Sequence, residues 1–80
     1  MYAMADWFEY RTLHVNMASR DGIVNYDSGL GDNPRNSGKG TPILVDYLNE
    51  QDVGRDGWEV CGVVPAGLTS TVILKRHKHT

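Results

Sequence analysis

A polar segment with two cations lies in the middle of the chain and offers the most suggestive chemistry. It reads Asn33-Pro34-Arg35-Asn36-Ser37-Gly38-Lys39-Gly40-Thr41 and ends where a helix is predicted to begin. Free backbone amides and the helix dipole at a helix N-terminus favour an anion, and glycines let the backbone approach it. A guanidinium can pair with a phosphate through two hydrogen bonds, and a lysine adds charge. The segment therefore predicts a ligand-binding loop made of Arg35, Asn36, Ser37, Gly38, Lys39, Gly40 and Thr41.

The ligand expected at this loop is a small phosphorylated molecule or a nucleotide. Tyr26, close to the loop in sequence, completes the predicted site as a stacking surface for a base. The loop differs from a Walker A motif, because Gly40 follows Lys39 where Ser or Thr belongs and Asn33 replaces the first glycine. The alternative interpretation is a solvated loop without a ligand.

The C-terminal end carries histidines and basic residues that suggest two weaker sites. His77 and His79 alternate, so both could face one metal ion, but two ligands without a third make a poor metal site. Lys75, Arg76 and Lys78 form a short basic end. The chain is acidic overall and has no recognised nucleic-acid-binding motif, so nucleic acid is not expected as a partner. We predict a solvated tail and no metal.

Catalytic groups are the least supported. Glu9 and Glu59 would act as acid and base only as neighbours on a sheet, and Arg11 would more simply neutralise them. Cys61 and His14 would need a similar register to form a nucleophile pair. Cys61 lies in an apolar stretch, which favours a small buried side chain over a reactive thiol. No reaction follows from the sequence, and we predict a protein that is not an enzyme and needs no cofactor.

Length and composition point to one small domain, residues 1–80, that gains from self-association. A chain of 80 residues buries only about 60% of its unfolded surface, and its single cysteine excludes an intrachain disulfide. Eight Lys and Arg against ten Asp and Glu give a net charge of −2, which identifies no class of partner. Residues 1–6 do not resemble a signal peptide, and no apolar run approaches the roughly 20 residues of a membrane span. A cytoplasmic protein without a membrane partner is expected.

The elements that must position these groups follow from periodicity and turn residues. Period-two patterns and β-branched residues predict strands, whereas Thr41 and Pro42 predict a helix start and Gly54 a left-handed helix end. The region 17–41 is irregular and rich in Gly and Asn. The predicted elements are strands over 7–15, 58–64 and 71–76, an uncertain strand at 22–27, and a helix over 42–53. Pro65 is expected to end the third strand. The fold class is α+β, a small antiparallel sheet of three to four strands with one helix packed on one face, in the order β-(β)-α-β-β.

Three motifs carry a resemblance to a known family. They are Phe8-Glu9-Tyr10-Arg11, then Leu48-Asn49-Glu50 with Gly54-Arg55-Asp56-Gly57-Trp58-Glu59-Val60, and finally Ile73-Leu74-Lys75-Arg76. This pattern resembles a widespread bacterial and phage family of short proteins described as a domain of unknown function. Its members read Trp-Glu-Tyr-Lys, then Gly-x-x-Gly-Trp-Glu-Leu-Val, then Leu-Lys-Arg. The resemblance implies a helix on a short antiparallel sheet and no particular activity.

A second apolar face leads to the functional hypotheses. If the helix covers Trp58, an apolar face made of Leu13, Val15, Cys61, Val63 and Ile73 lies away from it, and we predict that this face packs against a second copy. The leading hypothesis is a non-enzymatic, homo-oligomeric binding module for a small phosphorylated ligand, such as a phage protein that sequesters a nucleotide signal. The alternative is a structural or protein–protein interaction module.

Overall fold

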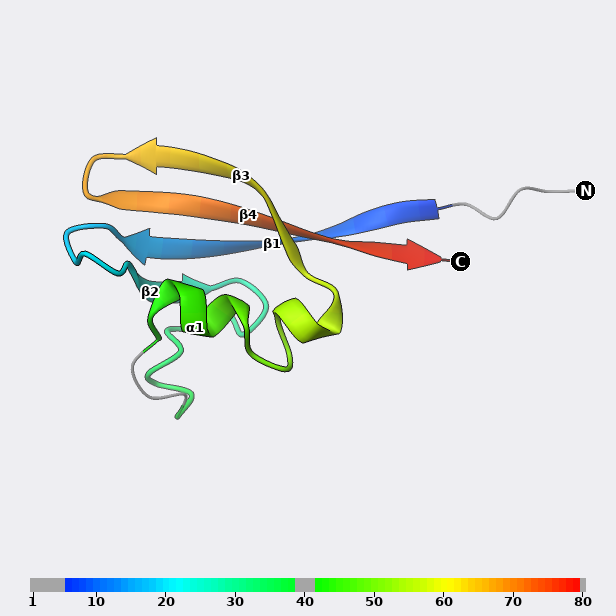
Figure 1. The fold of residues 1–80 in the computed structure, drawn as a ribbon, viewed down its shortest axis with the longest axis horizontal. Coiled ribbons are helices and arrows are strands. Elements are labelled where there is room, and N and C mark those ends of the chain that lie inside the picture. Colours follow the sequence, from blue (N-terminus) through cyan, green and yellow to red (C-terminus); the bar gives the residue numbers. More distant parts are fainter. Residues whose placement is uncertain (1–5, 39–41, 80) are drawn as a thin grey trace, which may run out of the picture.

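The strands form a single antiparallel sheet (Figure 1). The computed structural model describes residues 6–38 and 42–79, and the elements are β1 (Asp6–Asn16), β2 (Ile23–Asp27), α1 (Leu44–Leu48), a 3-10 turn η1 (Gly54–Asp56), β3 (Glu59–Ala66) and β4 (Thr69–His79). The spatial order of the strands is β2-β1-β4-β3, and each neighbouring pair is antiparallel. The α+β composition and the antiparallel sheet are therefore confirmed, and the uncertain strand at 22–27 is β2.

The two central strands, β1 and β4, are the longest and pair along their whole length. Their register runs from Asp6↔His79 to Asn16↔Thr69, so the C-terminal histidines belong to a strand and not to a solvated tail. β2 pairs only with the last four residues of β1, and β3 pairs with β4 up to Lys75. The remaining halves of β1 and β4 therefore extend to one side as a two-stranded ribbon (Figure 1).

One face of the sheet carries the hydrophobic core. The buried apolar side chains are Leu13, Val15, Val24, Tyr47, Val53, Val72 and Leu74, and Leu44, Leu48 and Trp58 pack against them. Cross-strand partners in an antiparallel sheet share a face. Leu13 pairs with Val72 on this core face, whereas Thr12 pairs with Ile73 on the opposite face, which we call the open face.

The residues that were predicted to form a second apolar face do not lie on one face of the sheet. Leu13 and Val15 are completely buried in the core with Tyr47 of α1, while Ile73 lies on the open face. A β-bulge at Cys61 explains part of the error. Val60 pairs with Leu74 on the core face and Val64 pairs with Thr71 on the open face, so the period-two pattern changes face within β3.

The helix is shorter than the predicted span of 42–53. The carbonyl of Pro42 accepts a hydrogen bond from the Val24 amide at 2.9 Å, and the Leu44 amide donates to the carbonyl of Gly22 at 3.0 Å. The segment before α1 is therefore extended and paired with β2. The acidic residues Glu50 and Asp52 disfavour a longer helix, because they lie where its negative end would be. No helix among the described residues is both long and apolar enough to cross a membrane.

Two positions near β3 also differ from prediction. Gly54 does not close the helix in a left-handed conformation. A Cβ atom there would lie 2.1 Å from the carbonyl oxygen of Leu48, so this position needs glycine because two backbone segments approach closely. Gly57 does adopt the left-handed conformation expected in the turn, with φ of 95°. Pro65 does not end β3 but lies within it opposite Ser70, which is possible because β3 is an edge strand.

Candidate functional site

The described part of the predicted ligand loop folds into consecutive tight turns. The amides of Asn36, Ser37 and Gly38 donate to the carbonyls three residues earlier at 3.0–3.1 Å, and the Arg35 amide donates to the Asn33 side chain at 2.9 Å. These four amides are engaged, so an anion here would contact mainly the exposed side chains of Arg35, Asn36 and Ser37. Lys39, Gly40 and Thr41 lie outside the described residues. The loop also contains a completely buried residue, Pro34, so it is not solvated along its whole length.

Tyr26, the aromatic member of the predicted site, lies on the open face of the sheet. It is the cross-strand partner of His14, and the two ring centroids are 5.1 Å apart. The first residue of α1, Leu44, uses its amide for the contact with Gly22, and α1 is only five residues long. That this loop and Tyr26 bind a phosphorylated ligand therefore stays a prediction.

A buried ion pair lies on the core face of the sheet and was not predicted from the sequence. Arg11 Nε donates to Asp27 Oδ1 at 2.6 Å, Arg11 Nη2 pairs with Asp27 Oδ2, and the Tyr47 hydroxyl donates to the same Oδ2 atom. Asp27 is completely buried and Arg11 is 7% exposed. The Gly29 amide adds a hydrogen bond at 2.8 Å, and Arg11 Nη1 donates to the Asp52 carbonyl at 3.2 Å. The network joins β1, β2 and α1.

The environment of this network shifts the pKa values of its members. Burial raises the pKa of the Asp27 carboxyl, but hydrogen bonds from Arg11, Tyr47 and Gly29 outweigh it, so the net pKa is lowered. Burial and the hydrogen bond to Asp27 raise the pKa of the Tyr47 hydroxyl. The hydrogen bond to Asp27 raises the pKa of Arg11. The network therefore holds Asp27 ionised and Tyr47 protonated.

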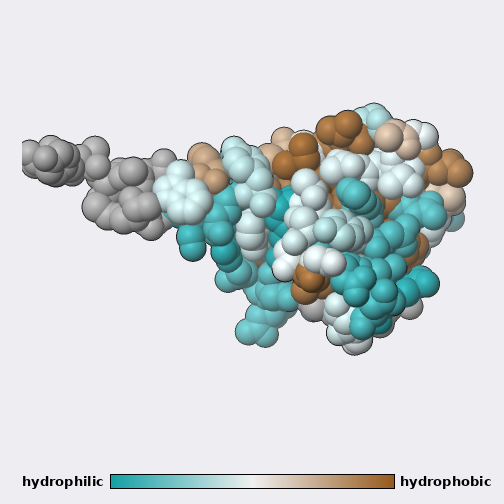
Figure 2. Space-filling model, turned by 180° about the vertical axis from the view of Figure 1, so that it is seen from behind, coloured by the Kyte–Doolittle hydropathy of each residue, from teal (hydrophilic) through white to brown (hydrophobic). Residues whose placement is uncertain are grey.

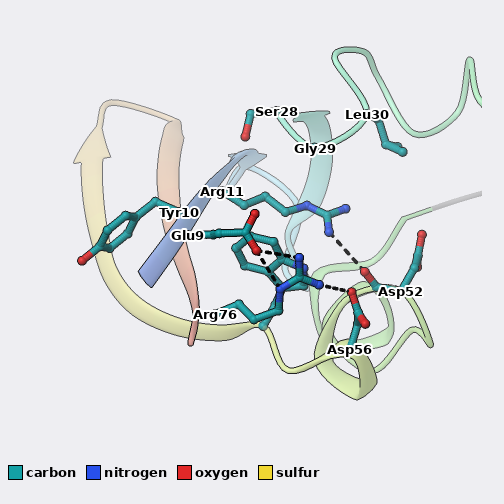
Figure 3. Close-up of a pocket in the computed structure, with 10 residues that line it drawn as sticks. Glu9, Tyr10, Arg11, Ser28, Gly29, Leu30, Asp52, Asp56 and Arg76 are labelled. Carbon is teal, nitrogen blue, oxygen red and sulfur yellow. Dashed lines mark hydrogen bonds and ion pairs between the residues drawn. The ribbon is translucent and has the colours of Figure 1, made fainter. Parts of the chain in front are cut away.

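A second charged cluster, which contains Glu9, Asp56 and Arg76 (Figure 3), lies beside Trp58 just after the 3-10 turn. Arg76 donates to Glu9 Oε1 through Nη2 at 2.7 Å and Nε at 3.2 Å, and its Nη1 pairs with Asp56. The guanidinium carbon of Arg76 lies 4.6 Å from the Trp58 ring centroid, and that of Arg11 lies 5.6 Å from it. Two cations thus contact one indole, and each is also paired with a carboxylate.

An open pocket of about 400 Å³ lies between these two clusters (Figure 3). It is lined by Glu9, Tyr10, Arg11, Ser28, Gly29, Leu30, Asp52, Asp56, Trp58 and Arg76. The guanidinium groups at its wall are already paired with Asp27, Glu9 and Asp56, so an incoming anion would have to displace a protein carboxylate. Within residues 6–38 and 42–79, no three His, Cys, Asp or Glu side chains are grouped to hold a metal ion.

The sheet order separates the residue pairs considered for catalysis. Since β4 lies between β1 and β3, neither Glu9 and Glu59 nor His14 and Cys61 are cross-strand neighbours. Glu9 Oε1 lies 2.7 Å from Arg76 Nη2. Glu59 lies on the open face, where its Oε1 is 3.7 Å from Lys75 Nζ. Arg11 is occupied by Asp27 and does not neutralise either glutamate.

The lowered carboxyl pKa values predict a loss of stability in acid. The pKa of Asp27 is lowered from 3.8, and a hydrogen bond from Arg76 lowers that of Glu9 from 4.5. The folded state then binds fewer protons than the unfolded state, so this stabilisation is complete above the unfolded pKa values and is lost as the pH falls through the folded ones. We expect the free energy of unfolding from urea titrations to be level near neutral pH and to decrease below about pH 4. Equal stability at about pH 5 and pH 3 would contradict this.

The edge strand β3 is the second candidate surface. All of its residues are exposed except Gly62, which is half-buried. The exposed fractions of Val60, Val63 and Val64 are 46%, 56% and 53%. Cys61 is also exposed, so the prediction that its side chain is buried was wrong.

The apolar surface continues beyond β3 into the adjoining turns. Leu68, in the β3–β4 turn, is 69% exposed, and its carbonyl accepts a hydrogen bond at 2.7 Å from the amide of Met17, itself 49% exposed. Figure 2 shows this apolar surface as a band along the upper edge of the molecule, where Figure 1 places β3. We call β3 with Leu68 and Met17 the β3 edge.

Comparison of the chain with protein-family models, curated proteins and solved structures finds no match. The resemblance of the three motifs to the short bacterial and phage family stays a prediction. The structure brings the three motifs together, because Glu9 of the first and Arg76 of the last form an ion pair beside Trp58 of the central one.

Proposed function

We propose that this protein is a non-enzymatic interaction module that binds another polypeptide by adding a β-strand to the β3 edge. The observation that carries the proposal is the exposure of Val60, Val63 and Val64 on an unpaired edge strand. An edge strand presents unpaired amides and carbonyls, and proteins usually protect such edges with charges or a covering segment. β3 has no charged residue from Val60 to Ala66, and the protective features that it does carry, the bulge at Cys61 and Pro65, leave its three valines exposed.

The energetics of strand addition support the same conclusion. The main chain of an added strand provides the hydrogen bonds, and alternate side chains pack on both faces of the sheet. The valines of β3 lie on both faces, since Val63 pairs with Val72 on the core face and Val64 with Thr71 on the open face. Burying the exposed half of each valine is worth on the order of 1 kcal/mol. A docked strand would therefore gain apolar contacts on both of its sides.

The segment that covers the core face leaves β3 exposed. We infer that α1 and the following segment to Val53 cover that face, because Tyr47 and Val53 are buried with the sheet residues and Leu44 and Leu48 pack against them. This cover does not reach β3, whose residues remain exposed on both sides of the sheet.

A labelled peptide of residues 59–66 with Ser in place of Cys61 provides the test. We expect its fluorescence anisotropy to increase with the concentration of the protein, because the peptide supplies an apolar strand to the β3 edge. The Val63→Lys variant should lose this binding, since a lysine would then lie at the docking edge. Val45→Lys is the matched control, because Val45 on α1 is 63% exposed and lies away from β3. Equal peptide binding by both variants, or none by the wild type, would contradict the proposal.

A further inference from the structure

We infer that the strand docked on the β3 edge is β3 of a second copy, which runs antiparallel to the first about a twofold axis. The inference names the partner of the proposed strand-docking site and therefore rests on the proposed function. In such a dimer the same surface serves both copies, and two four-stranded sheets join into one continuous sheet.

The charge distribution along β3 favours a second copy in the antiparallel orientation. Glu59, at the beginning of β3, is its only charged residue, and the segment 60–66 is uncharged. Antiparallel pairing places the two Glu59 side chains at opposite ends of the joined strands, whereas parallel pairing would bring like charges together. The uncharged segment, with its three valines, then meets its own copy without electrostatic repulsion.

The other edge strand of the sheet, β2, is partly covered by segments of the same chain. Pairing through β3 therefore produces a closed dimer. β2 is bridged by Ile43 at one end and by Asp32 at the other, and the Val24 amide donates to the Pro42 carbonyl at 2.9 Å. A sheet with one free apolar edge joins one partner of its own kind and then has no similar edge left.

The outer half of β1 exposes Trp7, Phe8 and Tyr10 at 45%, 43% and 64%, but the charged side chains among them keep this edge from being continuously uncharged, unlike residues 60–66 of β3. Glu9 is paired there with Arg76 at 2.7 Å and with Lys78 at 3.5 Å. Charged side chains of this kind disfavour strand addition at an edge. Among the described strands, β3 is therefore the edge that best fits a second copy.

Light scattering coupled to size-exclusion chromatography of the intact protein tests the inference. We expect twice the chain mass of 8.9 kDa for the wild type and for Val45→Lys, and a concentration-dependent shift toward the monomer for Val63→Lys. The dimer dissociation constant of Val63→Lys should be at least about tenfold higher. Val64→Lys serves as a second variant if Val63→Lys is poorly folded, because Val64 is similarly exposed on the other face. Amide hydrogen exchange should show protection of β3 in the wild type that both lysine variants lose.

Each alternative outcome has a distinct meaning. A wild type that remains monomeric up to about 100 μM, while the 59–66 peptide still binds, would overturn the second-copy inference and leave strand docking intact. A dimer that persists in both lysine variants would use another surface and would also overturn the inference. A wild type that neither binds the 59–66 peptide nor dimerises would contradict both the inference and the proposed function.

Discussion

Replacing Asp27 by alanine is expected to remove a large part of the stability of this protein. Asp27 is completely buried and receives hydrogen bonds from Arg11, Tyr47 and Gly29. The substitution removes the carboxylate that the buried Arg11 guanidinium and the buried Tyr47 hydroxyl contact. Removing one partner of a buried ion pair costs about 3–5 kcal/mol. A domain of this size has a total stability of roughly 4–12 kcal/mol. Thermal unfolding followed by circular dichroism should show a Tm lower by at least about 12 °C.

Two further variants distinguish the effect of an unpaired buried charge from the effect of a general loss of packing. Asp46→Ala is the matched control, because Asp46 is an exposed carboxylate in the first turn of α1 and should contribute at most about 1 kcal/mol. Adding Arg11→Met to Asp27→Ala should restore part of the lost stability, since no buried charge then lacks a partner. If the two substitutions were simply additive, the ion pair would not be the source of the effect.

The strands were predictable from sequence because their composition is strongly biased. The aromatic and β-branched stretch at 7–15 corresponds to β1, and the strands predicted over 58–64 and 71–76 correspond to β3 and β4. The helix was overestimated, because its apolar spacing continues through 43–48 but Pro42 and Ile43 pair with β2. Tertiary hydrogen bonds of this kind override local propensity, and nothing in the local sequence encodes them.

Face assignments failed where a single residue changed the register. A bulge at Cys61 moves Val64 to the face opposite Val60, and an isolated cysteine in an apolar stretch gives no warning of it. Leu13 was placed away from the helix because the sequence does not say which face of β1 the helix residues contact. The apolar second surface is consequently an edge and not a face.

The buried network had a sequence signal that could have been used. Arg11 shares its face of β1 with Leu13 and Val15, and a charge in an apolar row requires a buried partner. The identity of that partner was not predictable, because Asp27 lies 16 residues away and reaches Arg11 only when β2 pairs with β1. The cluster around Trp58 depends on a separation of 67 residues between Glu9 and Arg76, which only the pairing of β1 with β4 brings together.

Gly54→Ala, at the start of the 3-10 turn, should destabilise the connection between α1 and β3 far more than the same substitution of Gly62 within β3. The new Cβ would lie 2.1 Å from the carbonyl oxygen of Leu48, a backbone atom that cannot move without displacing the end of α1. The turn that follows positions Trp58, whose amide donates to the Val53 carbonyl at 3.1 Å. We therefore expect a loss of about 2–3 kcal/mol, at the upper end of the range for overpacked sites.

Gly62→Ala provides the comparison, because it makes the same chemical change at a position with space. The nearest atom to a Cβ at Gly62 is Ile73 Cδ1 at 3.9 Å, an ordinary contact, so its effect should remain within about 0.5 kcal/mol. Both substitutions are best measured by urea unfolding in the Val63→Lys background, where the proposed association at the β3 edge would not add to the apparent stability. Similar losses for the two variants would show that the close approach of Gly54 to Leu48 has no energetic consequence. A large loss for Gly54→Ala alone would identify this contact as the constraint that holds the Trp58 cluster against the sheet.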